Sequence, residues 1–271
     1  MRFLNNMILY EGQHDKGSDY YLVGLNTDFV FPLHFHRSFE LTLLLEGEMQ
    51  VHLENEDITL KAGDMLFVGS NCIHDQLTVG SSKSLICIFS PDIIGAVSAK
   101  FYNYPLKTPV IRNVGEYHIK TFEALNENYI REKEGIGNPA ITKGALYTLM
   151  GLFFEQLDFN APSFYADRHA LLGKIFEFVE ENKESAFTLT DMADRLEYSP
   201  VYLSRFFHEN AGIPFRDYVQ MVKMNHACWL LRTTRESILD IALRCGYSST
   251  SSFNRMFKQI VGISPLEYRK G

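Results

Sequence analysis

An internal duplication near the C-terminus constrains the fold of this 271-residue chain more than any other feature. Residues 188–213 recur as residues 237–263, at an offset of 49 (237 − 188) that becomes 50 after one extra residue. The matched pairs are Thr188 and Ser237, Leu189 and Ile238, Asp191 and Asp240, Ala193 and Ala242, Arg195 and Arg244, Ser199 and Ser249, Leu203 and Phe253, Arg205 and Arg255, Phe207 and Phe257, Gly212 and Gly262, and Ile213 and Ile263. The repeat therefore predicts two copies of one small unit.

Each copy has the signals of two helices joined by a tight turn. Thr188 and Ser237 each precede an Asp by three residues, as in a capping box, and Ser199-Pro200 is an N-cap followed by proline at the first helical position. These signals predict helix-turn-helix units over residues 188–210 and 237–260. Residues 214–232 between them contain no breaker and predict a helix roughly 28 Å long. Successive major grooves on one face of DNA lie about 34 Å apart, so such a connector could place both units in adjacent grooves.

The N-terminal half has the texture of short strands. Apolar and polar residues alternate over residues 40–45, 49–53, 58–60, 65–68 and 85–89, with turns expected at Glu46-Gly47 and at 62–64. Period-two runs at close spacing predict an antiparallel barrel or sandwich. The fold class expected is therefore α+β and multidomain, with the barrel at residues 1–115.

Residues 116–160 change to helical spacing and predict a helical hairpin. Asn138-Pro139 supplies an N-cap for the second helix. Apolar Leu149, Leu152 and Phe153 lie on one side of that helix and could form a dimer interface or pack on the barrel. Residues 161–167 are expected to be a linker, and residues 168–271 to form the C-terminal domain.

Charge and composition narrow the function classes. The net charge is −7, but residues 168–271 hold 14 Lys and Arg against 12 Asp and Glu (+2), which leaves −9 on residues 1–167. An acidic sensor joined to a mildly basic DNA module fits this division. The four cysteines are dispersed without a CxxC pair, which favours buried thiols in a reducing compartment. We expect a cytoplasmic protein without membrane contact, because no apolar run is long enough to span a bilayer and the first ten residues do not resemble a signal peptide.

Four residues of the N-terminal half have metal-ligand chemistry. His34, His36 and Glu40 are spaced so that they alternate along a strand and share its inward face, and His74 follows later. Three imidazoles and a carboxylate could hold a divalent transition metal. A structural role, with the histidines satisfied inside the barrel, remains the alternative.

The C-terminal strings resemble the DNA-binding domain of the AraC family of regulators across residues 168–270. They are residues 189–193 (LTDMA), 199–207 (SPVYLSRFF), 240–247 (DIALRCGY), 253–258 (FNRMFK) and 262–269 (GISPLEYR). Departures are Lys223, where the family more often has Arg, and Val201, where many members carry a larger or polar side chain. The resemblance implies that the base-facing positions are Val201, Ser204, Arg205, Thr250, Ser251, Asn254 and Arg255. Arg can pair with guanine and Asn with adenine, although phosphate contacts or intramolecular pairs are the alternative for both arginines.

The histidine motif, with Gly47 and Gly63, is similar to the two-part motif of cupin barrels, some of which bind metal through these residue types. The second block departs from that pattern at Gly69, Asn71 and Thr78. The resemblance to the AraC family implies instead that His34, His36, Glu40 and His74 line a polar pocket for a sugar-like effector. Phe31, Phe35 and Phe39 are then expected to supply aromatic walls.

The resemblance further implies a transcription activator with double-stranded DNA, a small-molecule effector and RNA polymerase as partners, acting as a homodimer. It implies no catalytic residue and no cofactor. Two other functions stay open. A metal-dependent cupin enzyme would leave the duplicated helix-turn-helix unexplained, and a regulator whose barrel only dimerises would bind no ligand.

Overall fold

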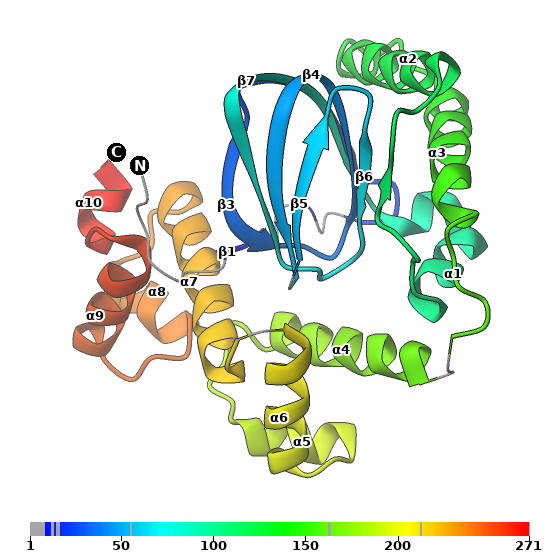
Figure 1. Ribbon diagram of the computed structural model, residues 1–271. Helices are drawn as coiled ribbons and strands as arrows, with labels where there is room; N and C mark the ends of the chain where they lie inside the picture. The colour runs from blue at the N-terminus through cyan, green and yellow to red at the C-terminus, as the bar shows by residue number, and fades with distance from the viewer. Residues whose placement is uncertain are drawn as a thin grey trace. The chain divides into compact units, whose positions relative to one another are not determined.

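The computed structural model describes residues 9–11, 14, 17–54, 56–161, 164–211 and 213–270. These residues form two compact units, one over residues 11–169 and one that contains residues 170–271 (Figure 1). Within the described ranges, no helix has both the length and the apolar character needed to cross a bilayer.

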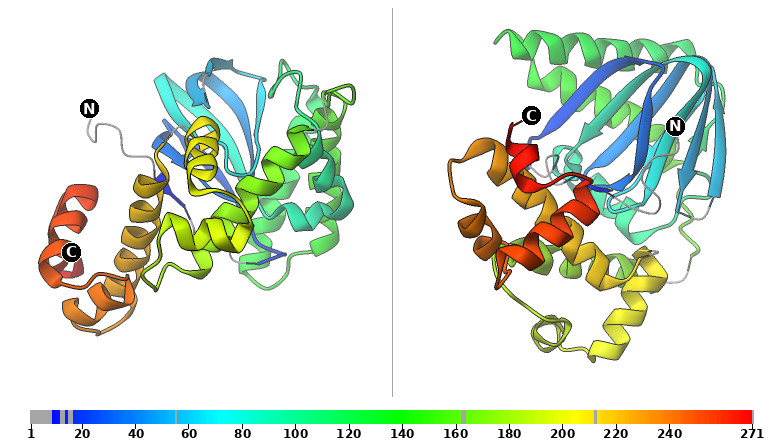
Figure 2. Two further views of the ribbon diagram at one scale, coloured as in Figure 1. Left: turned by 90° about the horizontal axis from the view of Figure 1, so that it is seen from below. Right: turned by 90° about the vertical axis from the view of Figure 1, so that its left-hand side faces the viewer.

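The first unit is built on antiparallel strands. They are β2 (Tyr21–Thr27), β3 (Val30–Phe35), β4 (Phe39–Leu53), β5 (Glu56–Lys61), β6 (Met65–Val68), β7 (His74–Phe89) and β8 (Val110–Ile111), whereas the short β1 (Leu9–Tyr10) belongs to the other unit. Strand β7 pairs with β2, β3 and β4, and β4 also pairs with β5 and β6. Figure 2 shows the resulting sheet as strongly curved. This arrangement confirms the expected cupin-type barrel.

Strand β4 passes through the position where the sequence predicts a turn. Glu46 and Gly47 lie inside this 15-residue strand, and its register with β7 shifts on either side of them. Gly47 has φ +83°, and a Cβ there would lie 2.0 Å from the carbonyl oxygen of Ser81. The turn prediction was therefore wrong, because the glycine forms a bulge that bends one long strand. The turn at Gly63, between β5 and β6, is confirmed.

Helices cover one face of the sheet. They are η2 (Pro91–Val97), α1 (Ser98–Asn103), α2 (Glu116–Lys133) and α3 (Pro139–Phe154). A large apolar core joins the residues of β4, β6 and β7 that face these helices to the helices themselves, and Phe39, Phe67, Phe122 and Phe153 belong to it. A second, smaller core on the other side includes Leu44, Met49 and Leu66. The sheet is thus buried on both faces.

The helical hairpin is confirmed, and its apolar side faces its own barrel. The Asn138 side chain accepts a hydrogen bond from the Ala140 amide, as an N-cap should. Leu149 and Phe153 are fully buried in the larger core, and Leu152 packs against it. Of the two expected roles, packing on the barrel is confirmed for Leu149 and Phe153, whereas Leu152 is only half-buried.

The second unit contains the predicted duplication. Its helices are α4 (Phe164–Glu181), α5 (Leu189–Leu196), α6 (Pro200–Ala211), α7 (Phe215–Thr233), α8 (Ile238–Arg244), α9 (Thr250–Val261) and α10 (Pro265–Lys270). Thr188 and Ser237 cap α5 and α8 as predicted, and Ser199 accepts a hydrogen bond from the Tyr202 amide. Helix α7 packs against α6, α8 and α9 and lies between the two helix pairs. Both helix-turn-helix units are therefore present.

Two of the sequence predictions involve residues that lie outside the described part of the chain. Helix α4 begins at Phe164, so the end of the expected linker is helical, while Pro162 and Ser163 lie outside the described part of the chain. Gly212 also lies outside it, but its counterpart Gly262 has φ +90° and ends α9. A left-handed glycine is a common helix stop.

Candidate functional site

Helix α6 has an apolar side that packs into the unit and a polar side that is free of it. Leu203 and Phe207 are fully buried. Val201 is 80% exposed, and Ser204 and Arg205 are also exposed. The Arg205 Nε lies 2.9 Å from Glu209 Oε1, one turn along the helix. Exposed ion pairs of this kind are weak, so the guanidinium can exchange its partner for a phosphate or a base.

Helix α9 repeats this arrangement. Phe253 and Phe257 are buried in the core, and Ser251, Asn254 and Arg255 are exposed on the opposite side. Thr250, at the first position of the helix, is half-buried. The structure thus places the predicted base-facing residues on the outer sides of α6 and α9, the second helix of each helix-turn-helix unit.

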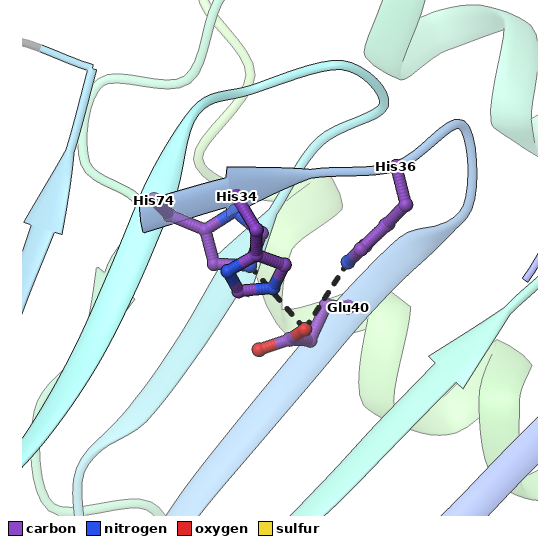
Figure 3. A group of neighbouring side chains, drawn as sticks. All are labelled: His34, His36, Glu40 and His74. Atoms are coloured by element: carbon purple, nitrogen blue, oxygen red, sulfur yellow. Dashed lines mark hydrogen bonds and ion pairs between the residues drawn. The ribbon is translucent and has the colours of Figure 1, made fainter. Parts of the chain in front are cut away.

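In the cupin-type unit over residues 11–169, His34, His36, Glu40 and His74 come together as one cluster (Figure 3). Their nearest ligand atoms all lie within 4.8 Å of one another. His34 lies on β3, His36 directly after it, Glu40 on β4 and His74 at the start of β7. The expectation that three of them alternate along one strand was wrong, because a tight turn at residues 37–38 separates β3 from β4. The turn brings them together across neighbouring strands instead.

All three imidazoles are oriented by backbone carbonyls. The Nδ1 atoms of His34, His36 and His74 lie 2.9 Å from the carbonyl oxygens of Pro32, Ser38 and Cys72. A carbonyl oxygen only accepts hydrogen bonds, so Nδ1 carries the proton in each neutral ring. The Nε2 lone pairs are then left to face the centre of the cluster.

Glu40 supplies the negative charge of the cluster and is 2% exposed. Its Oε2 lies 3.3 Å from His36 Nε2 and 3.4 Å from His74 Nε2, while its Oε1 accepts hydrogen bonds from Thr42 and Gln76. Burial alone would raise the pKa of Glu40, but His74 and His36 hold the pKa well below its usual range. Burial likewise opposes the charge on His74, but Glu40 raises the pKa of that imidazole. Burial, followed by repulsion from His74, lowers the pKa of His34 to about 2.

The donor set fits a divalent transition metal. Three neutral imidazole nitrogens and a carboxylate are preferred ligands of such ions, and hydrogen bonds from Nδ1 to carbonyls are the usual support of metal-binding histidines. Lone pairs that converge on a carboxylate repel one another unless a proton or cation lies between them. The four side chains are also almost fully buried.

Three residues that lie beside the cluster were not predicted from the sequence. Gln76 follows His74 by two residues on β7, so strand alternation could have found it. Glu11 Oε2 lies 3.7 Å from His34 Nε2 and 3.1 Å from His14 Nε2. No sequence pattern connects Glu11 or His14 to the cluster, since they precede the first long strand.

The expected aromatic walls are divided between the site and the core. Phe31 contacts His34, with ring centroids 4.6 Å apart. Phe39 instead packs against Phe67 and Phe89 in the apolar core. The expectation that Phe39 faces a ligand was therefore wrong, because its side chain points to the opposite face of β4 from Glu40.

Comparisons with known proteins agree with this division of the chain. A family model described as a helix-turn-helix domain matches residues 192–271, and one described as a cupin domain matches residues 21–89. A cupin domain followed by paired helix-turn-helix units defines a DNA-binding transcription regulator.

Two relatives that match most of the chain are transcription regulators. The melibiose operon regulatory protein of Escherichia coli (strain K12) is 25% identical over 252 residues, which is 88% of this chain and 83% of the relative. The HTH-type transcriptional activator RhaR of Mannheimia succiniciproducens is 23% identical over 250 residues, which is 88% of this chain and 87% of the relative. Over most of its length the chain is similar to transcription regulators of the AraC family.

A solved structure shares the two-part fold. The crystal structure of ToxT from Vibrio cholerae with a bound unsaturated fatty acid matches with a TM-score of 0.59 at 15% identity. The match covers 93% of this chain and 95% of that chain. At this identity the likeness concerns the fold.

Proposed function

We propose that this regulator reads a specific DNA site with both α6 and α9 and responds to a ligand of its cupin unit. The observation that carries the DNA proposal is the pair of exposed polar helix faces joined by the 19-residue helix α7. Side chains on such faces can reach base edges, and a rigid connector can place both faces on one side of the duplex.

Selection of bound duplexes from a random pool by the full chain tests this proposal. We expect a site with two separate boxes, and Arg255→Ala should weaken binding to it by about 1–3 kcal/mol if Arg255 reads a base. Arg131→Ala, at an exposed position of α2, is the matched control. Equal losses on selected and random DNA would show that Arg255 contacts only the backbone, and failure to select any sequence would refute the proposal.

For the cupin unit, we propose that His34, His36, Glu40 and His74 bind a divalent transition metal. Two Nε2 atoms lie beside the buried Glu40 carboxylate, and a ligand atom of His34 lies within 4.8 Å of the other three, which supports this reading. When bound, such an ion would supply a Lewis-acidic point of attachment for an effector.

Equilibrium dialysis of the chelator-treated full chain against zinc, cobalt or manganese ions tests the metal proposal. We expect about one ion per chain, with binding abolished in His36→Ala. His52→Ala should retain it, because His52 pairs with the exposed Asp57 and is not one of the four clustered residues. A wild-type protein that takes up no ion would contradict the proposal and return the cluster to a purely structural role.

A carbohydrate-like effector remains our proposal for the small molecule itself. The named relative that regulates a melibiose operon supports it. A polar pocket of about 270 Å³ adjoins the cluster through His14, and its lining includes Arg37, Ser38, Asp92 and Tyr102. Hydroxyl and charged groups around a concave pocket suit a hydroxylated ligand.

A thermal-shift screen with monosaccharides and disaccharides tests the effector class. A ligand of the pocket should raise the unfolding temperature of the wild type and lose that effect in Arg37→Ala. A screen in which no sugar stabilises the chain would contradict this part of the proposal. Activation of transcription, contact with RNA polymerase and homodimerisation also stay proposals, of which activation is supported by the activator among the relatives.

A further inference from the structure

The two helix-turn-helix units are joined at a second place besides α7. The loop between α4 and α5 contacts α7 and the end of α8 through a group of five residues that we name the loop hub. The loop hub consists of Glu184, Ser185, Lys223, His226 and Arg244. None of these residues is among those expected to face DNA.

Glu184 forms the charged part of the loop hub. Its Oε1 lies 2.7 Å from an Arg244 guanidinium nitrogen and 2.8 Å from His226 Nε2. A second nitrogen of Arg244 lies 2.6 Å from Glu236 Oε1. Glu184 precedes the first helix-turn-helix unit, whereas Arg244 ends the first helix of the second unit. The carboxylate therefore links the loop that leads into the first helix-turn-helix unit to the second unit.

Lys223 forms the buried part of the loop hub. The side chain is 6% exposed, and its Nζ donates a hydrogen bond of 2.8 Å to the carbonyl oxygen of Ser185. Gly246, in the turn of the second unit, has φ +77°, and a Cβ there would lie 2.6 Å from that same oxygen. The loop thus packs on the second unit with no space for a side chain between them.

The duplication provides an internal comparison. Arg195 of the first unit matches Arg244 in the repeat. Arg195 lies 2.9 Å from Glu181 at the end of α4, so its contact stays on the side of the first unit. Arg244 contacts Glu184 across 60 residues of chain. Of these two equivalent arginines, Arg244 belongs to the second helix-turn-helix unit but contacts a residue that lies before the first one, whereas Arg195 contacts a residue that precedes its own unit.

We propose that the loop hub, with Glu184 at its centre, fixes the distance and angle between α6 and α9. Two helix-turn-helix units joined by one helix alone can change their relative orientation when that helix bends. A second connection through the loop hub restricts this bending. Glu184 then acts as a positioning residue that determines which separation of two DNA boxes the protein accepts. This inference depends on the proposed recognition of DNA by both helices.

The test uses the full chain and the duplex that the wild type selects from a random pool. Affinity is measured by fluorescence anisotropy for that duplex, for versions with about one to three base pairs inserted or removed between the boxes, and for a duplex with one box. Glu184→Gln removes the charge at the loop hub. Glu181→Gln is the matched control, because Glu181 pairs with the arginine of the first unit.

We expect Glu184→Gln to bind the selected duplex about threefold more weakly, since partly exposed ion pairs are individually weak. Its affinities across the spacing series should become more even, with one-box binding unchanged. Arg244→Lys should give the same profile, and Glu181→Gln should keep that of the wild type.

A wild-type spacing profile in both Glu184→Gln and Arg244→Lys would overturn the inference. So would an equal loss on the one-box duplex, because that loss would show a general effect on the fold. If the wild type selects no sequence at all, the proposed DNA recognition fails first and the inference falls with it.

Discussion

Glu40 places a buried negative charge inside the cupin unit. A buried carboxylate is costly unless it is paired and hydrogen-bonded, and here two imidazoles, a hydroxyl and an amide surround it. The pKa of Glu40 is held below its usual 4.5 and the pKa of His74 is raised above its usual 6.5. The pair therefore stabilises the fold in mildly acidic solution, between about pH 4.5 and pH 6.5.

The sign of each contribution follows from these directions. A carboxyl with a lowered folded pKa loses its contribution as the pH falls through that pKa, and an imidazole with a raised folded pKa loses its contribution as the pH rises through it. In metal-free protein, wild type should exceed Glu40→Gln in the free energy of unfolding most at mildly acidic pH. The difference should shrink in stronger acid and again above neutrality.

Urea unfolding at a series of pH values measures this difference. Asp57→Asn is the matched control, because it breaks a carboxylate–imidazole pair in which the Asp57 side chain is 92% exposed. Its unfolding free energy should stay parallel to that of the wild type. Parallel curves for Glu40→Gln as well would show that the buried pair is not ionised.

At the scale of the element, strand β4 depends on one glycine. Gly47 combines a left-handed φ with close backbone contact, whereas Gly80 on β7 has φ +74° and open space around it. Gly47→Ala should therefore destabilise the chain by more than Gly80→Ala, for which left-handed strain of about 1–2 kcal/mol is expected. Chemical denaturation of both variants decides between them. Equal losses would mean that Ser81 moves aside without cost.

At the scale of the whole molecule, control of DNA binding by the cupin ligand must be reciprocal. If zinc changes the affinity for the selected duplex by some factor, the duplex must change the affinity for zinc by the same factor. Typical coupling is 5- to 150-fold, so about tenfold is a measurable expectation. Anisotropy with and without zinc, and zinc titration with and without the duplex, measure the two factors. Independent binding, with both factors near one, would leave the cupin metal without a regulatory role.

Local signals decided the helix caps and the repeated helices of this protein, and the sequence was sufficient for them. The caps at Thr188 and Ser237 and the N-cap at Asn138 act within one turn of helix, so each could be identified from its neighbours. The repeat fixed the two helix-turn-helix units because the same local pattern occurs twice. The residues of the histidine cluster were also found, because their chemistry is distinctive.

Tertiary structure decided the features that connect distant parts of the chain. The bulge at Gly47, the packing of Leu149 and Phe153 on the barrel and the contact from Glu184 to Arg244 all depend on partners that no local pattern specifies. The same holds for Glu11 beside His34. The physical reason is range: hydrogen-bonded caps and strand alternation act between near neighbours in sequence, whereas burial and ion pairing depend on which surfaces the folded chain brings together.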